Sequence, residues 1–435
     1  MKTIRGILKT AFIRFRIIIN MPFKSEAQSI LQLNRSTFHF YVQPMQLVTY
    51  FTVLFISLSI QKLSAQNTFQ LNGRNLILQE GKYYELTTKD TVLVDVNNVI
   101  VKFKPGQENI GTTLLENTQG LFKKHQLLNN ELHFKLPPSS DFITAINTLI
   151  NTEEVYSVRF GYLLKAKNSE SLYRTSTGSG TNTSGNNNLS ENDRSWPNDE
   201  QQVDFWELVK THIAGDYSGN NLNAWDYSVG NPNIIVAVID NGLVWNDADF
   251  SPANTLGYDY YDGDSDVTPL IPSNLDIEMG TAVASIIAAR TSNEHAMYGV
   301  AGGFYANETT PPVTLMVLRA FSENYFYSTI AVVESIIHAV NNGARIINLG
   351  LILENENTDI ADAISYASDN GVIIFSPAGD NGFYSEDVEW PASRADVIAV
   401  GGTDLDDRRA KWGFRIESNQ GPNTEISLPA ENIEV

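Results

Sequence analysis

Apolar residues in the second half of the chain form short, continuous runs, each too short for a helix and suited to a strand buried on both faces. The five runs are residues 234–239, 313–318, 346–349, 372–375 and 397–400. Residues 329–342 and 359–370 carry apolar positions at helical spacing, and Gly343 and Gly371 are placed to end those helices. Strands that alternate with helices predict βαβ units, so we expect a doubly wound, mostly parallel α/β sheet. Functional groups of such sheets lie beyond the carboxyl ends of the strands.

Residues 66–166 have a different pattern, in which short strand-like runs lie between turns. Residues 92–103 are β-branched and partly alternating, and residues 155–164 indicate a closing strand. Residues 141–152 have helical spacing, with Asp141 as the predicted N-cap. The pattern therefore predicts a small α+β domain ahead of the α/β domain.

The composition changes after residue 166. Residues 167–196 are rich in Ser, Thr, Gly and Asn and predict a solvated linker, and the α/β domain follows over residues 197–435. The whole chain has a formal net charge of -20, which disfavours nucleic acid and anionic membranes as partners. It contains no cysteine, so disulfides, a thiolate nucleophile and a cysteine-based zinc site are excluded.

Residues 1–65 are interpreted as an N-terminal extension followed by a signal peptide at about 45–65. The apolar stretch 47–60 has signal-peptide length and is short for a membrane span, and a small-residue cleavage site follows at Ala65. We interpret the basic extension as an over-long start, with translation beginning at Met45; the alternative is an uncleaved anchor. Because no other stretch reaches the length of a span, we expect a secreted or cell-envelope protein with no stable membrane insertion after cleavage.

Asp240 stands directly after the first buried run, and Gly242 soon after it permits a sharp turn. A carboxylate at this position can orient an imidazole, bind a metal or cap a turn. Taken alone, Asp-x-Gly after a strand favours a structural turn, so the neighbouring motifs decide its interpretation.

A series of ordered motifs gives Asp240 its context. AWDYSVGNPNIIVAVIDNGLVWNDADF contains Asp240, and MGTAVASIIAAR begins at Met279. YGVAG, LMVLRAF, GARIINLG, GVIIFSPAGDNG, WPAS and VIAVGGTD then follow in that order. In sequence and order these motifs resemble those of the subtilisin-like serine proteases, from Pro197 to roughly Pro429. The resemblance implies a subtilisin-like α/β fold, and the domain at 66–166 occupies the place of the family's propeptide.

The resemblance also implies a mechanism, peptide hydrolysis by acyl transfer. In the family a serine attacks the carbonyl, a histidine moves the proton, an aspartate orients the histidine, and an asparagine stabilises the oxyanion. By position Asp240 matches the triad aspartate, Met279 occupies the histidine position, and Asp380 occupies the asparagine position. A thioether cannot serve as general base. An ionised carboxylate would repel the negative charge that develops on the oxyanion.

The substrate-pairing segment also departs from the family. Gly350, Leu351 and Ile352 stand where the family has Ser-Leu-Gly, and a branched side chain in place of the glycine is expected to crowd a peptide strand. Leu428 begins the match to the family's Ala-Pro-Gly, and the sequence ends at Val435, before the Gly-Thr-Ser block that supplies the nucleophile. We therefore expect a sheet that is incomplete at its C-terminal side and lacks the triad serine.

No neighbouring residue is expected to replace the histidine. Glu278 precedes Met279, but adjacent helical residues point about 100° apart. His338 lies on a helical pattern and is interpreted as packed or solvated rather than catalytic.

The loop 259–266 bunches carboxylates at Asp262, Asp264 and Asp266. Alternating carboxylates can bind Ca²⁺, but the twelve-residue calcium loop with its closing glutamate is missing. We interpret the loop as solvated, with Ca²⁺ as the weaker alternative, and we expect no required cofactor.

Three functions follow from these observations. The resemblance implies a serine endopeptidase with peptides or proteins as substrates, and we expect it to be inactive because Met279 stands at the histidine position and the serine block is missing. It is alternatively a peptide- or protein-binding pseudoprotease, or a fragment of a broken protease gene. The residues do not determine a substrate preference or an oligomeric state.

Overall fold

The computed structural model describes residues 68–165 and 208–431, apart from gaps at 72, 88–90, 120, 128–130, 139, 209, 214–223, 246–248, 270–278, 292–297, 304–311, 323–325, 354 and 414. The chain divides into two compact units, Met1–Ala65 and Gln66–Val435, and all described residues belong to the second. The predicted signal peptide, the predicted linker and Glu278 therefore lie outside the described residues.

Residues 68–165, called the N-terminal domain below, form an antiparallel sheet with two helices. Its elements are β1 (Thr68–Leu71), β2 (Arg74–Gln79), β3 (Lys82–Leu86), β4 (Thr91–Phe103), α4 (Glu108–Gln119), β5 (Phe122–Gln126), β6 (Glu131–Lys135), α5 (Phe142–Ile150) and β7 (Val155–Lys165). The strand order is β1-β2-β3-β4-β6-β5, and β7 pairs with β4. Asp141 caps α5 as the pattern predicts, since its side chain accepts the N–H of Thr144. Val99, Phe134 and Ile146 are fully buried in the core of this domain.

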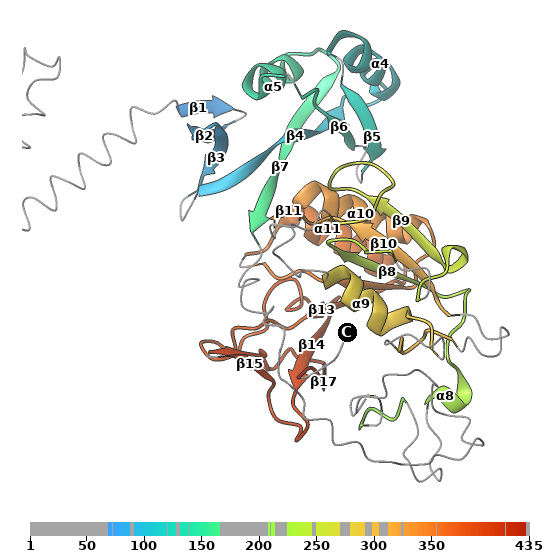
Figure 1. The fold of residues 1–435 in the computed structure, drawn as a ribbon. Helices are drawn as coiled ribbons and strands as arrows, with labels where there is room; N and C mark the ends of the chain where they lie inside the picture. Colours follow the sequence, from blue (N-terminus) through green and yellow to red (C-terminus); the bar gives the residue numbers. More distant parts are fainter. Residues whose placement is uncertain are drawn as a thin grey trace, which may run out of the picture. The chain divides into compact units, whose positions relative to one another are not determined.

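The second half of the chain forms a seven-stranded parallel sheet in the order β17-β14-β13-β12-β8-β10-β9, which confirms the predicted fold class (Figure 1). Its strands are β8 (Ile235–Asp240), β9 (Thr255–Asp259), β10 (Thr314–Arg319), β12 (Ile346–Leu349), β13 (Ile373–Pro377), β14 (Ile398–Thr403) and β17 (Ile426–Pro429). The five predicted runs are the five inner strands. The edge strands β9 and β17 were not predicted, because neither is a continuous apolar run.

The remaining elements lie outside this sheet. They are α8 (Ala224–Tyr227), a short 3₁₀ turn (Pro252–Asn254), α9 (Met279–Ala288), β11 (Phe326–Ser328), α10 (Thr329–Asn341), α11 (Thr358–Asp369), β15 (Lys411–Gly413) and β16 (Ile416–Glu417). Of these, β11 pairs with β7 of the N-terminal domain, and β15 and β16 form a separate two-stranded sheet. The helices α10 and α11 occupy the predicted helical segments, and Gly343 and Gly371 follow them with φ of 84° and 75°. Only glycine takes such angles without strain, so both helices end where the sequence indicates.

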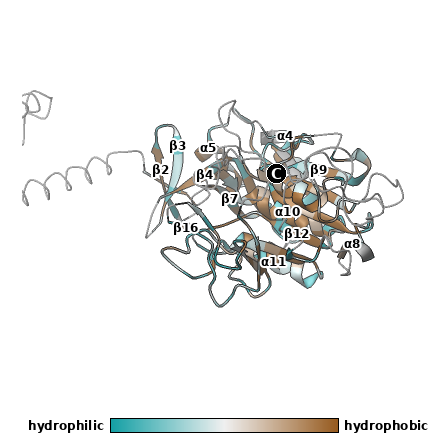
Figure 2. Ribbon diagram, turned by 60° about the horizontal axis from the view of Figure 1, so that its bottom comes forward, coloured by the Kyte–Doolittle hydropathy of each residue, from teal (hydrophilic) through white to brown (hydrophobic). Residues whose placement is uncertain are grey.

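Alternate residues of the central strands face two separate cores. On β8, Ala237 and Ile239 pack with α10 and α11, whereas Val236 and Val238 pack with α9. This arrangement explains why β8 is apolar throughout, since both of its faces are covered. Hydrophobic residues accordingly concentrate around α10 and β12 (Figure 2).

The edge strand β17 is less protected. It pairs only with β14 among the described residues, and the side chains of Ile426 and Leu428 are 37% and 43% exposed. No helix of the described residues is long and apolar enough to cross a membrane.

The N-terminal domain is joined to the α/β domain by strand pairing. The end of β7 lies antiparallel to β11, with Leu163 opposite Ser328 and Lys165 opposite Phe326. A Cβ at Gly161 on β7 would lie 2.7 Å from the Ile330 side chain, so glycine allows this close approach to α10. The helix that supports the sheet thus also carries the N-terminal domain.

Candidate active site

Asp240 is the last residue of β8 and is 3% exposed. One carboxylate oxygen accepts the N–H of Asn241 at 2.7 Å, and the other, Oδ2, has no hydrogen-bond partner among the described residues. Burial raises the pKa of Asp240 to about 7, and the hydrogen bond from the Asn241 N–H lowers it only in part. The aspartate of a catalytic triad accepts a hydrogen bond from the N–H of the histidine that it orients. Among the described residues, no imidazole donates to Asp240 in this way.

The start of α9 is fixed directly beside this aspartate. The Asn241 side chain accepts the N–H of Gly280 at 2.8 Å, and a Cβ at Gly280 would collide with the carbonyl of Gly242. Met279 is the first residue of α9 and is partly buried. The structure thus places the thioether on the helix start that is anchored to the residue after Asp240.

The predicted groove segment follows β12 and also lies against Asp240. A Cβ at Gly350 would collide with Asp240 Oδ2, so only glycine fits there without a shift. Leu351 is fully buried in the core, and its carbonyl accepts the hydroxyl of Ser376 at 3.1 Å. Gly350 and Ile352 are partly exposed.

Asp380 lies in the loop after β13 and is 3% exposed. Gly379, with φ of 118°, turns the chain at this point. The loop is held by the fully buried Asn419, whose side chain accepts the N–H of Asn381 at 2.7 Å and whose own N–H donates to the carbonyl of Gly379. The sequence analysis missed Asn419, because nothing in its local pattern marks it.

Tyr327 on β11 is a second residue that the sequence analysis missed. Burial raises the pKa of its phenol, and the nearby carboxylates of Asp240 and, to a smaller extent, Asp380 raise it further. Asp240, Asp380 and Tyr327 therefore share one region, together with Gly350. The neutral phenol can donate a hydrogen bond there, but it cannot act as a base near neutral pH.

The carboxylates of the acidic loop 259–266 form ion pairs and hydrogen bonds with neighbouring residues. Arg319, which is 1% exposed, pairs with Asp262 at 2.6 Å and also with Asp259. Asp264 accepts the N–H of Asp266, which in turn accepts the N–H of Thr268. Across the described part of the chain, no group of three or more His, Asp or Glu side chains is arranged to hold a metal ion. Binding of Ca²⁺ at this loop stays a prediction.

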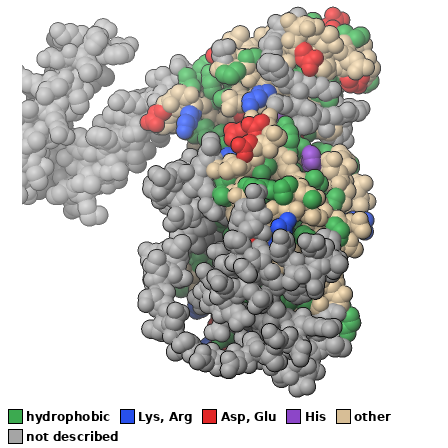
Figure 3. All heavy atoms as spheres, turned by 45° about the vertical axis from the view of Figure 1, so that its right-hand side comes forward, with side chains coloured by type: hydrophobic (Ala, Val, Ile, Leu, Met, Phe, Trp, Pro, Cys, Tyr) green, Lys and Arg blue, Asp and Glu red, His purple; other side chains and the backbone are tan. Residues whose placement is uncertain are grey.

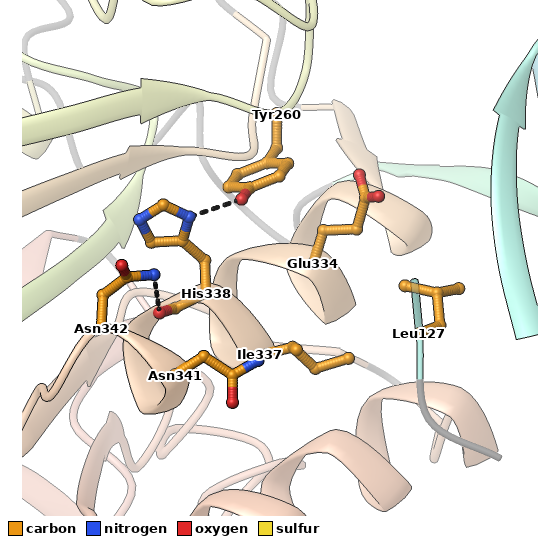
Figure 4. Close-up of a pocket in the computed structure, with 7 residues that line it drawn as sticks. All are labelled: Leu127, Tyr260, Glu334, Ile337, His338, Asn341 and Asn342. Carbon is orange, nitrogen blue, oxygen red and sulfur yellow. Dashed lines mark hydrogen bonds between the residues drawn. The ribbon is translucent and has the colours of Figure 1, made fainter. Parts of the chain in front are cut away.

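His338 lies away from this site. It stands in the last turn of α10, and because α10 follows the carboxyl ends of the strands, its last turn lies toward their opposite ends. Its Nδ1 is 2.7 Å from the hydroxyl of Tyr260, and it lines a cavity of about 180 Å³ with Glu334 and Leu127 (Figure 4). The prediction that His338 is packed rather than catalytic is in agreement with these contacts.

The parallel sheet, with an aspartate at the carboxyl end of the inner strand β8 and a helix start beside it, has the arrangement expected of a subtilisin-like α/β fold. Residues 231–434 match the Subtilase family. Residues 231–434 are therefore a subtilase domain.

The chain is similar to several individual proteins. The chain is 33% identical to the thermophilic serine proteinase of Bacillus sp. (strain AK1) over 232 residues, and this alignment covers 52% of each chain. It is 28% identical over 210 residues to thermitase of Thermoactinomyces vulgaris, covering 48% of this chain and 67% of that one. The crystal structure of the epidermin leader peptide processing serine protease (EpiP) from Staphylococcus aureus aligns with 18% identity and a TM-score of 0.44, over 77% of this chain and 74% of that chain.

The match covers only part of the relatives. It spans 52% of the length of the Bacillus proteinase and 44% of that of halolysin from Haloferax mediterranei. The chain thus spans about half of the length of these relatives. The family match supports a protease-like function for the domain.

Proposed function

We propose that the subtilase domain of this chain does not hydrolyse peptide bonds. The observation that carries the proposal is Met279 at the position of the general base, on the helix start anchored beside Asp240. A thioether neither accepts nor returns a proton near neutral pH, so Met279 cannot activate a nucleophile.

The oxyanion position supports the same proposal. Asp380 is buried and presents a carboxyl group where the family presents an amide donor. In subtilisin, loss of one such donor lowers the rate by about 10²–10³, and loss of the histidine lowers it by about 10⁶. The two losses together leave no route to measurable turnover.

The proposal is tested on the purified chain with a broad mixture of fluorogenic peptides, beside the variants Asp240→Asn and Asp406→Asn. Asp406 is exposed and pairs with Arg408, so its variant is a control for changed surface charge. We expect all three proteins to match the buffer blank. Hydrolysis by the wild type and by Asp406→Asn that is lost in Asp240→Asn would contradict the proposal.

A second candidate function is binding without cleavage. The edge of β11, next to Tyr327, already accepts an extended strand, since β7 pairs with it over three residues. Main-chain pairing of this kind needs no catalytic group. In this function the α/β domain binds the N-terminal domain of the same chain. Its other proposed partners are peptides or proteins.

We also propose export of the protein from the cytoplasm. The support is the apolar segment at 45–65 with its cleavage site at Ala65. Named relatives include the minor extracellular proteases Vpr and Epr of Bacillus subtilis, and also the major intracellular serine protease of the same organism. Nucleic acid is not a proposed partner, because the chain is acidic and Lys and Arg are scattered on the face that Figure 3 displays.

A further inference from the structure

A continuous chain of hydrogen-bonded side chains connects the N-terminal domain to α10. It runs from Ser328 through Asp95, Asn98 and His133 to Glu334, so that both of its ends lie at or on α10 and its middle lies on β4 and β6. Apart from Asn98, which is partly buried, these residues are at most 4% exposed. A buried chain of this kind must satisfy every donor and acceptor in it, because water cannot.

The orientation of Asn98 is fixed by its neighbours. Its Nδ2 lies 2.9 Å from a carboxylate oxygen of Asp95, and a carboxylate can only accept, so Nδ2 donates there. The Oδ1 of Asn98 must then be the atom 2.8 Å from His133 Nε2. An amide oxygen can only accept, so Nε2 of His133 carries a hydrogen.

The other ring nitrogen of His133 also faces an acceptor. Its Nδ1 lies 2.6 Å from Oε1 of Glu334. A neutral imidazole has one N–H, and Nε2 already uses it, so a hydrogen bond to an ionised Glu334 requires a second ring proton. If the proton sits on Glu334 instead, the pair still holds the same number of protons.

We propose that contact between the N-terminal domain and α10 takes up one proton, which is bound between His133 and Glu334. When the domain contact opens, both side chains enter water. Above about pH 7 a free imidazole is neutral and a free carboxylate is ionised, so the open pair holds one proton fewer than the closed pair. By linkage the contact becomes weaker as the pH rises above the range of free histidine, by up to about tenfold per pH unit. It is fully formed at lower pH.

The other ionisable groups around the pair do not need a proton for their contacts. Lys135 on β6 donates to the backbone carbonyl of Asp262 at 2.8 Å, and Arg159 on β7 pairs with Glu131 and Asp359 as permanent charges. Asp95 accepts hydrogen bonds from Asn98 and Ser328.

The aromatic neighbours behave in the same way. Tyr258 and Tyr260 line the space beside Glu334, and their pKa values are raised by burial and then by the Glu334 charge, so both phenols stay neutral. Tyr261 lines the same space. One turn along α10 from Glu334, His338 faces the hydroxyl of Tyr260, which can donate to a neutral imidazole.

The test is amide hydrogen exchange of the full chain between pH 7 and pH 9, followed at residues 326–328 of β11. Each measured rate is divided by the chemical exchange rate at the same pH, which leaves the opening equilibrium. For the wild type we expect this equilibrium to rise by up to tenfold per pH unit.

The decisive variant is Glu334→Gln. A glutamine can donate to a neutral His133 Nδ1, so the chain of hydrogen bonds survives without the additional proton and the pH dependence is expected to disappear. The matched control is His338→Gln, which removes the nearby histidine of the same helix and is expected to keep the wild-type slope. Equal slopes in the wild type and Glu334→Gln would overturn the proposal.

A second measurement covers the case in which Glu334→Gln does not fold. Nuclear magnetic resonance of the wild-type chain, labelled in its histidine rings, follows the titration of His133 and His338. We expect His133 to keep its second proton at a pH where His338 is neutral. If His133 loses that proton first, no additional proton is bound at the contact and the proposal is wrong.

Discussion

At the scale of single residues, the site is defined by what surrounds one carboxylate. Asp240 is buried, Gly350 leaves room for its Oδ2, and Met279 begins the helix beside it. The hydrogen bond from Asn241 thus fixes the position of the Asp240 carboxylate, and burial raises its pKa. An ionised carboxylate that is buried in this way lowers the stability of the fold. One substitution tests the effect of its charge, and a second tests the space beside it.

The first is Asp240→Asn, studied as a function of pH. Because the folded pKa of about 7 lies above the unfolded value of 3.8, the folded wild type binds the additional proton, and its stability falls as the pH rises from about 4 through 7. An asparagine does not titrate. We therefore expect the variant to gain relative to the wild type by up to about 4 kcal/mol in the free energy of unfolding between pH 4 and pH 8. Urea denaturation at the two pH values measures this, and an equal difference at both would contradict it.

The second is Gly350→Ala, which adds a Cβ where Asp240 Oδ2 now lies. Either the carboxylate or the strand end must shift, and overpacking of this kind costs about 1–3 kcal/mol. The matched control is Gly413→Ala, whose Cβ would come no nearer than 3.4 Å to the Ile416 side chain. Thermal unfolding of both variants checks the expectation, which fails if they lose equal stability.

At the scale of elements, the ends of the helices were set by local residues. Asn357 caps α11, and its side chain accepts the N–H groups of Asp359 and Ile360 at 3.1 Å. The cap satisfies two donors that the helix itself leaves unpaired. Its contribution can therefore be measured separately from packing.

Replacement of Asn357 by alanine is expected to cost about 1 kcal/mol in the free energy of unfolding. Asp362→Ala, at an exposed position of the same helix, is the control and should change stability by no more than about 0.5 kcal/mol. Chemical denaturation at constant pH compares the two. A loss at Asn357 no larger than that at Asp362 would mean that the cap does not stabilise α11.

The sequence predicts elements well where the signal is local and continuous. The inner strands such as β8 and β12 are apolar on both faces, so their runs are visible without the fold. The edge strands β9 and β17 carry polar or glycine residues and become strands only by pairing with a neighbour. Their register depends on residues far away in the chain, which no window of sequence contains.

The same distinction applies to the candidate site. Asp240, Met279 and Asp380 were predicted because ordered motifs surround them. Tyr327 and His133 were not, since each depends on a partner from another part of the fold. Glu334, the partner of His133, is 201 residues away, and nothing near either residue indicates the pairing.

At the scale of the whole molecule, the N-terminal domain and the α/β domain meet through strand pairing and buried polar contacts. The seam contains the β7 and β11 pair, the hydrogen bond from the N–H of Tyr162 to the Thr329 hydroxyl, and the ion pair of Arg159 with Asp359. None of these contacts depends on the peptide chain between the two domains. The association is therefore expected to outlast a cut in that connection.

This expectation can be tested with a protease recognition sequence inserted between residues 167 and 196. After cleavage at pH 7, we expect the two fragments to elute together in size-exclusion chromatography. A variant with Gly161→Phe places a large side chain against Ile330 and should elute as two species. Separation of the fragments without that substitution would mean that the seam is too weak to hold the domains.

The strand at the open side of the parallel sheet has a practical consequence. β17 is four residues long and presents Ile426 and Leu428 partly to solvent, and no strand of the described residues pairs with its outer edge, so that edge can offer backbone groups to other chains. At high protein concentration this edge can recruit further copies into intermolecular sheets. Aggregation during purification would then begin at residues 426–429, far in sequence from the residues that decide catalysis.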